Sequence, residues 1–450
     1  MNNIKPMPMD PKVQWANDKC DKYDYLISVF CGAAAGAIDV FFVGMPGASK
    51  AGKIADATAD EMVKGFARMM GWKPGVGGAS NPASAIGFLE RRFPVNYDHT
   101  STKAVGGQFR MSTKNHHIKS LAHCPDIIGL FFSILDQFTN TATFLDGRGG
   151  IIRIDTSDSG FELRGSTFPE KLFCGFCNWL GHLMSDLAGS SGSRGKGLEG
   201  RGSGIPIPFA ELFLMCNFGR FQVGKDRQTL ADIMTRAFQE GYDARHGGAM
   251  AIPVVLEECM IRVLWSVKRH FYAHKDWSEC IPTNAHADLR IMLIVGNATL
   301  CLIDGADAVI RSGGNALAFV LHMNLIAWAR LVLLVLRELR IRYGSSVDAA
   351  AMKFLSQTGF ADKYALRQYY ERMGTYRKNL DEQLRQFTVQ VEKEYKEFEA
   401  SVDYILNGSG QNSMERMRAS AMFAAKYGVP QNRIMHSTRE LDAWIMGKVR

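Results

Sequence analysis

The stretch DYLISVFCGAAAGAIDVFFV occupies residues 24–43. Its side chains are mostly apolar or small, and as one helix it is long enough to cross a lipid bilayer. A second long stretch, ALAFVLHMNLIAWARLVLLVL at 316–336, is interrupted by Arg330, and RIMLIVGNATLCLID at 290–304 is too short to cross alone. Because apolar windows do not separate a membrane span from a helix buried in a large core, both locations stay open.

The composition points to a folded protein, and its mildly basic charge fits either an anionic partner or a plain surplus of Lys and Arg. Of the 450 residues, 46% are hydrophobic, which excludes a mainly disordered chain. The formal net charge of +8 suits a phosphate, a nucleic acid or a membrane lipid surface without requiring one. The nine cysteines show no framework spacing, which is typical of reduced thiols. We therefore expect a location in the cytoplasm or on the cytoplasmic side of the inner membrane.

Helical spacing dominates the chain, so the sequence predicts a mainly α protein with a large multi-helix core. Residues 141–168 alternate apolar and polar side chains around turn residues, which predicts a small antiparallel β-hairpin insertion. Four parts are expected in order: a loose arm at 1–23, the helical core at 24–345, amphipathic charged helices at 346–405 and a small helical tail at 406–450.

Ionisable side chains within apolar sequence indicate one polar centre, because burying them is costly unless they are paired or bound to a metal. His182 and Asp186 in GHLMSD are four apart and share one helix face, as two ligands of one metal do. His117 and His123 are six apart, so a local break is needed to bring them together. With Asp39 they complete a candidate ligand set for Zn or Mn. In the alternative reading, each of these residues has only a structural role.

A Gly-rich basic loop, SSGSRGKGLEGRGSG at 190–204, follows Asp186 closely. Its candidate substrate-binding residues are Arg194, Lys196 and Arg201, which together with backbone N–H groups suit a phosphate. The loop matches no Walker pattern. If no metal is bound, a surface loop without a ligand is the better interpretation.

Four short elements resemble the YdjM-like family of predicted inner-membrane metal-dependent hydrolases, which is similar to zinc-dependent phospholipase C and single-strand nucleases. They are Asp39 in GAAAGAID, the segment HHIKSLAH, the element GHLMSD and the Gly-then-Pro element GIPIPF, and they lie within residues 24–210. The resemblance implies a phosphoester hydrolase in which His117, His123 and Asp186 are catalytic. A metal would lower the pKa of a bound water and make it a nucleophile near neutral pH.

The sequence departs from that family in four places, one of which is the spacing between His117 and His123, longer by one residue. Ile38 precedes Asp39 where the family usually has Pro, and Ala122 stands where the family has Thr. The predicted hairpin is inserted between the two histidine elements. The scaffold can therefore persist without the metal, and whether the chain is an enzyme depends on whether the cluster binds one.

A second hypothesis from another class is a homo-oligomeric transmembrane pore or ion channel. Small-residue apolar helices with internal charges and a basic exterior fit such a protein. In overall make-up the chain is similar to transmembrane effectors of bacterial anti-phage defence systems such as Hailong. A nucleic-acid ligand would then suit Tyr369 and Tyr370 among Arg and Lys. In that reading the His/Asp cluster is structural.

Overall fold

The computed structural model describes residues 19–47, 50–74, 82–99, 111–112, 114–145, 150–165, 167–189, 204–343, 363–408, 413–426, 429 and 431–446. Its chain divides into two compact units that interleave along the sequence. The first unit comprises Met1–Glu61 and Phe218–Arg367, and the second comprises Met62–Asn217 and Gln368–Arg450. This division cuts across the predicted helical core at 24–345.

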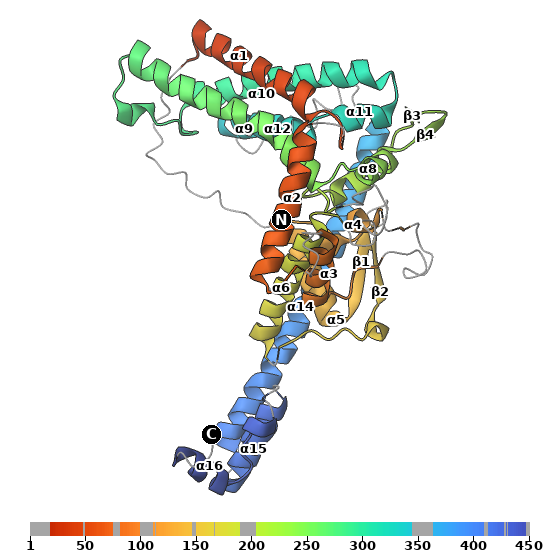
Figure 1. Cartoon of the computed structure of the whole chain (residues 1–450), viewed down its shortest axis with the longest axis vertical. Coiled ribbons are helices and arrows are strands. Elements are labelled where there is room, and N and C mark those ends of the chain that lie inside the picture. Colours follow the sequence, from red (N-terminus) through yellow and green to blue (C-terminus); the bar gives the residue numbers. More distant parts are fainter. Residues whose placement is uncertain are drawn as a thin grey trace. The chain divides into compact units, whose positions relative to one another are not determined.

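The first unit is built from helices packed around α1 (Lys22–Ile38), which continues as a π-helical turn over Asp39–Val43. Its other elements are α8 (Leu230–Gln239), α9 (Ala244–Val267), α10 (Ala287–Ser312), α11 (Ala316–His322), α12 (Leu325–Tyr343) and the hairpin of β3 (Phe221–Val223) and β4 (Asp226–Gln228). Helices α1, α9, α10 and α12 lie side by side (Figure 1).

Glycine allows α1 and α10 to approach closely. A Cβ atom added to Gly32 would lie 2.2 Å from the carbonyl oxygen of Gly296, and one added to Gly36 would lie 3.0 Å from Ile303. The buried side chains of Cys31, Ile261 and Leu293 pack in the adjoining core. Backbone proximity of this kind is typical of small-residue helix interfaces.

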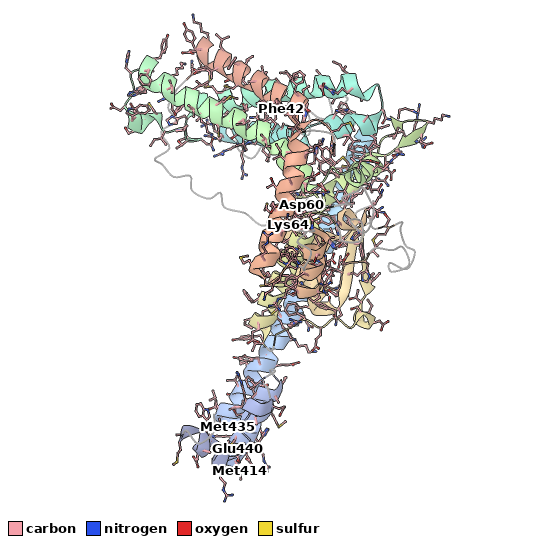
Figure 2. The ribbon with its side chains drawn as sticks, viewed as in Figure 1. Phe42, Asp60, Lys64, Met414, Met435 and Glu440 are labelled. Atoms are coloured by element: carbon pink, nitrogen blue, oxygen red, sulfur yellow. The ribbon has the colours of Figure 1, made fainter. Side chains whose placement is uncertain are left out.

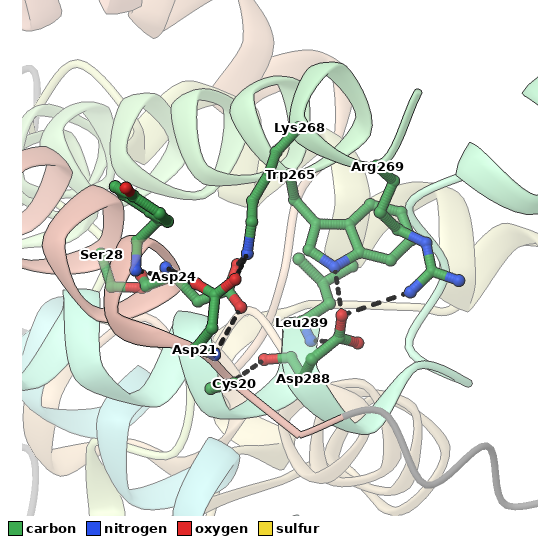
Figure 3. A network of polar contacts seen from close by, with 10 residues as sticks. Cys20, Asp21, Asp24, Ser28, Trp265, Lys268, Arg269, Asp288 and Leu289 are labelled. Atoms are coloured by element: carbon green, nitrogen blue, oxygen red, sulfur yellow. Dashed lines mark hydrogen bonds and ion pairs between the residues drawn. The ribbon is translucent and has the colours of Figure 1, made fainter. Parts of the chain in front are cut away.

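A polar network fixes the relative directions of three of these helices (Figure 3). Lys268 follows the end of α9, and its Nζ lies 2.7 Å from a carboxylate oxygen of Asp21 and 2.7 Å from one of Asp24, both at the start of α1. At the start of α10, Asp288 accepts hydrogen bonds from Trp265 at 2.9 Å and from Arg269 at 3.3 Å. Acidic groups at two helix N-termini therefore meet basic groups at one C-terminus, which also complements the helix dipoles.

In the part of the chain that the structure describes, two helices are long and apolar enough to cross a membrane: Lys22–Val43 and Ala287–Ser312. The second contains 290–304, which the sequence analysis set aside as too short; the helix extends past both ends of that apolar run. Helix α11 and the segment Leu325–Arg342 pass the same test together but are bent by 74°. Several large apolar side chains on these helices are exposed, among them Phe30, Phe41, Leu302, Ile310 and the Phe42 labelled in Figure 2.

The predicted fold class, mainly α with a small antiparallel β-hairpin, is confirmed. The predicted hairpin lies in the second unit. Strands β1 (Thr141–Leu145) and β2 (Ile151–Asp155) pair antiparallel with Thr141 opposite Asp155. Its helices are α3 (Pro82–Arg92), α4 (His116–Lys119), α5 (Ile127–Thr139), α6 (Phe168–Asp186), α7 (Glu211–Leu214), α15 (Ser413–Lys426) and α16 (Thr438–Ile445). Helices α2 (Lys50–Met69) and α14 (Lys363–Asp403) each begin in the first unit and end in the second.

Local sequence explains where α6 begins and where α5 begins and ends. Helix α6 begins at a capping box formed by Thr167 and Glu170. Helix α5 begins after Asp126, whose carboxylate accepts from two backbone N–H groups, and ends at Asn140 in the left-handed conformation. That turn leads directly into β1, so the hairpin and the helix are joined without a loop.

Candidate metal centre

An interruption of the helix brings His117 and His123 together. His117 lies in α4, Ser120 is extended and forms a β-bridge with Phe144, and His123 ends a 3₁₀ turn over Leu121–His123. The rings of His117 and His123 consequently stack with centroids 4.6 Å apart. The spacing of six residues therefore places both on one site only because the helix is interrupted between them.

Helix α6 supplies the other two members of the cluster. His182 Nε2 lies 3.2 Å from His123 Nε2 and 3.3 Å from Asp186 Oδ2. His117 Nε2 lies 3.4 Å from the same Asp186 oxygen. Three imidazole nitrogens and one carboxylate oxygen thus converge in the second unit, and all four side chains are buried.

These separations match the edges of a metal coordination polyhedron. Two nitrogen or oxygen ligands that lie about 2.0–2.1 Å from a tetrahedral zinc are about 3.3 Å apart. Asp186 Oδ2 has no hydrogen-bond partner among the described residues, although two histidine nitrogens face it. A buried carboxylate oxygen in this situation fits a cation better than it fits an apolar core. The residues present therefore fit a divalent metal.

A backbone contact prepares His117 as a ligand. Its Nδ1 lies 2.9 Å from the carbonyl oxygen of Gly204, which is only an acceptor, so Nδ1 carries the proton. The Nε2 lone pair is then free to face Asp186 and the other imidazoles. Hydrogen bonds of this kind orient most metal-binding histidines.

Burial sets the protonation states of the cluster. It lowers the pKa of His117 and His123 well below the ordinary value, and it lowers the pKa of His182. Burial, with the charge of Asp98, raises the pKa of Asp186 well above its ordinary value. Neutral imidazoles are the form that binds metal, and a cation would offset the cost of the buried carboxylate.

Two further residues belong to the cluster and were not in the predicted ligand set. Asp98 Oδ1 lies 3.2 Å from His116 Nε2 and 4.0 Å from His123 Nε2. Asp98, His117 and His123 form a second group whose ligand atoms lie within 4.8 Å of one another. Because the side chain of Asp98 is about one-third exposed, it marks where the cluster meets solvent. The sequence signal was the adjacent pair His116–His117; Asp98 stands in irregular sequence that carries no periodic signal.

The structure places Asp39 in a different polar cluster. Asp39 Oδ1 accepts a 2.6 Å hydrogen bond from Asn324 Nδ2 in the first unit, where Asp304 also binds the backbone N–H of Asn324. Its carboxylate is therefore occupied by partners on α10 and beside α12, and the ligand set of the second unit forms without it. Arg194, Lys196 and Arg201 lie outside the described residues.

Tyr97 holds two of the rings in place. Its ring meets His123 and His182 edge-on, with centroids 5.2 and 5.8 Å away, and its hydroxyl accepts a 2.8 Å hydrogen bond from Ser133 on α5.

Comparisons of the chain with protein-family models, with curated proteins and with solved structures gave no match.

Proposed function

We propose that this chain is a membrane-associated, metal-dependent hydrolase that acts on a phosphoester. The observation that carries the proposal is that His117 Nε2 and His182 Nε2 lie 3.3–3.4 Å from Asp186 Oδ2, while His123 Nε2 lies 3.2 Å from His182 Nε2. Carboxylate and imidazole ligands suit Zn or Mn. A divalent ion held there would act as a Lewis acid and lower the pKa of a coordinated water toward neutrality.

The protein's own residues have distinct roles in this proposal. His182 and Asp186 hold ligand positions one helical turn apart, and Gly204 fixes the tautomer of His117. Asp98 lies at the solvent-facing side of the cluster, within reach of a proton on His116. A carboxylate there is suited to accept a proton from an incoming water.

The choice of a phosphoester rests on the basic loop and on the likeness to the YdjM-like family. Residues 190–203 connect Gly189, three residues after Asp186, to Gly204, whose carbonyl oxygen contacts His117. Both attachment points of the loop are therefore at the candidate centre. The sequence of this loop contains Arg194, Lys196 and Arg201, and cationic side chains suit an anionic substrate.

Hydrolysis of bis(p-nitrophenyl) phosphate by the full chain, loaded with Zn or Mn in detergent, tests the proposal. We expect turnover that is lost in His182→Ala and kept in His274→Asn. His274 is exposed and has a φ of 53°, which Asn tolerates, so it is a matched control. Turnover that is equal in His182→Ala and the wild type would overturn the assignment.

A pore or channel is the second candidate function, and one observation favours it. Asp39 and Asp304 are buried carboxylates within the two candidate spans, and ionisable groups in such segments commonly mark ion pathways. Release of a trapped dye from vesicles separates the two functions. Under the hydrolase proposal the vesicles stay intact, whereas release that survives His182→Ala would favour the pore.

A further inference from the structure

A second group of potential ligands lies in the second unit next to the histidine cluster in sequence. Cys124 follows His123 directly, Asp126 precedes α5 and Glu211 begins α7. One ligand atom from each of these residues lies within 4.8 Å of the other two. Cys124 and Glu211 are almost completely buried, with exposed fractions of 0% and 1%.

The cysteine and the glutamate are spaced as metal ligands. Cys124 Sγ lies 3.5 Å from Glu211 Oε2. A sulfur at about 2.3 Å and an oxygen at about 2.0 Å from a tetrahedral zinc are also about 3.5 Å apart. A thiol that donates a weak hydrogen bond to a carboxylate lies at the same distance, so the Cys124–Glu211 separation fits both a metal site and a hydrogen bond.

Two unpartnered polar atoms favour the metal. Glu211 Oε1 is buried and has no hydrogen-bond partner among the described residues. The hydroxyl of Tyr376 on α14 is likewise buried without a partner, in a side chain that is 4% exposed. Burial raises the pKa of this hydroxyl, and the charges of Glu211, Cys124 and Asp126 raise it further. Buried polar atoms are nearly always satisfied, so an unpartnered carboxylate oxygen within the group of ligands, with a second unpartnered atom that feels their charge, indicates a ligand at this place.

Asp126 retains the capacity to take part. Its Oδ1 accepts from the N–H groups of Ile128 and Gly129, and its Oδ2 accepts from the N–H of Phe209 at 2.8 Å. Because each carboxylate oxygen accepts about two bonds, Oδ2 keeps one lone pair. The carboxylate is thus held in a fixed position by three backbone groups while one coordination site remains.

We propose that Cys124, Asp126 and Glu211 form a second binding site for a zinc-like divalent cation, distinct from the histidine cluster. Thiolate with carboxylate ligands suits zinc better than magnesium or calcium. The site would tie the turn after His123 to α7 and to the segment that follows Gly204. It would therefore hold the two backbone segments that position His123 and His117.

Cobalt(II) titration of the purified full chain tests this site specifically, because thiolate coordination gives a near-ultraviolet charge-transfer band that histidine coordination does not give. We expect the band in the wild type and in His182→Ala. It should disappear in Cys124→Ser and persist in Cys280→Ser, which alters another buried thiol in the first unit. Glu211→Gln preserves the side-chain volume and should weaken cobalt binding about tenfold or more.

The outcomes separate this site from the proposed function. A wild type that lacks the band, or a band that survives Cys124→Ser, would overturn the second site whatever the histidines bind. A band that depends on Cys124 in a protein whose total metal is unchanged by His182→Ala would support this site and contradict the hydrolase proposal. If Cys124→Ser fails to fold by circular dichroism, Glu211→Gln decides: unchanged cobalt affinity there contradicts the site.

Discussion

His123 Nε2 lies 3.2 Å from His182 Nε2, although the two residues are 59 positions apart in the chain. Two neutral imidazoles meet at this distance when one donates to the other or when both face one cation. Asp186 Oδ2 lies 3.3 Å from His182 Nε2 and accepts no hydrogen bond from any residue that the structure describes, which favours the cation.

The edge-on packing of Tyr97 predicts a graded effect on the cluster. Tyr97→Phe removes the acceptor of the Ser133 hydroxyl and should cost about 1 kcal/mol while metal binding is retained. Tyr97→Ala leaves a cavity beside His123 and His182 and should cost about 3–5 kcal/mol. Urea denaturation gives both values. Equal losses in the two variants would show that the ring does not support the cluster.

Asp136 predicts a pH dependence that one substitution isolates. Burial raises the pKa of Asp136 to about 7, although Thr143 and Thr141 donate hydrogen bonds to it. Between about pH 4 and 7, Asp136 keeps its proton in the folded state but has released it in the unfolded state. Its contribution to the free energy of unfolding therefore falls as the pH rises through that window. The loss reaches about 4 kcal/mol at pH 7 and above, since one pKa unit is about 1.4 kcal/mol.

Asp136→Asn removes this titration. The stability of the variant relative to the wild type should therefore increase as pH rises from about 4 to 7, whatever the other groups do. Denaturation of both proteins at each pH measures the difference. A constant difference over that range would contradict the raised pKa.

The Gly32–Gly296 contact predicts a sharp local sensitivity in the first unit. Gly32→Ala would place a Cβ atom 2.2 Å from a backbone oxygen, so α1 and α10 must separate, at a cost of about 1–3 kcal/mol. Gly248→Ala in α9 meets no atom within 4 Å and gains helix propensity, so it should be neutral or stabilising. Thermal unfolding in detergent compares the two variants. If Gly248→Ala is the more damaging one, the close packing of α1 and α10 is not required.

Exposed apolar side chains on α10 predict membrane binding. Leu302 is 71% exposed on a helix long enough to cross a membrane, and Leu302→Arg should lower the fraction of protein that floats with vesicles. Val389→Arg is the control, because Val389 is 61% exposed on the charged helix α14. Flotation that both substitutions reduce equally, or that neither reduces, would argue against insertion of α10.

Much of the fold followed from local patterns, and the site followed only in part. Alternation over 141–168 predicted the hairpin, and the four-residue spacing of His182 and Asp186 predicted their shared helix face, because both patterns are local. The length of α10 was underestimated because polar ends conceal the continuation of an apolar helix. Asp98 joins the cluster through tertiary contacts alone, which no spacing reveals.

Asp39 shows the other limit of the sequence. An acidic residue in apolar sequence indicates that a partner exists, but it does not say which of two buried clusters supplies it. Asn324 and Asp304 do so here, from residues more than 260 positions away in the chain. Grouping Asp39 with the histidines relied on the order of short motifs, whereas the contacts depend on how α1 packs against α10.

The proposed hydrolase depends on a divalent metal bound by the cluster around Asp186, and elemental analysis of the purified protein beside His182→Ala shows whether that metal is bound. We predict zinc or manganese at about one equivalent or more in the wild type, with one equivalent lost in a His182→Ala variant that keeps the wild-type circular dichroism. A folded wild type without metal after growth in metal-supplemented medium, or a metal content unchanged by His182→Ala, would contradict it.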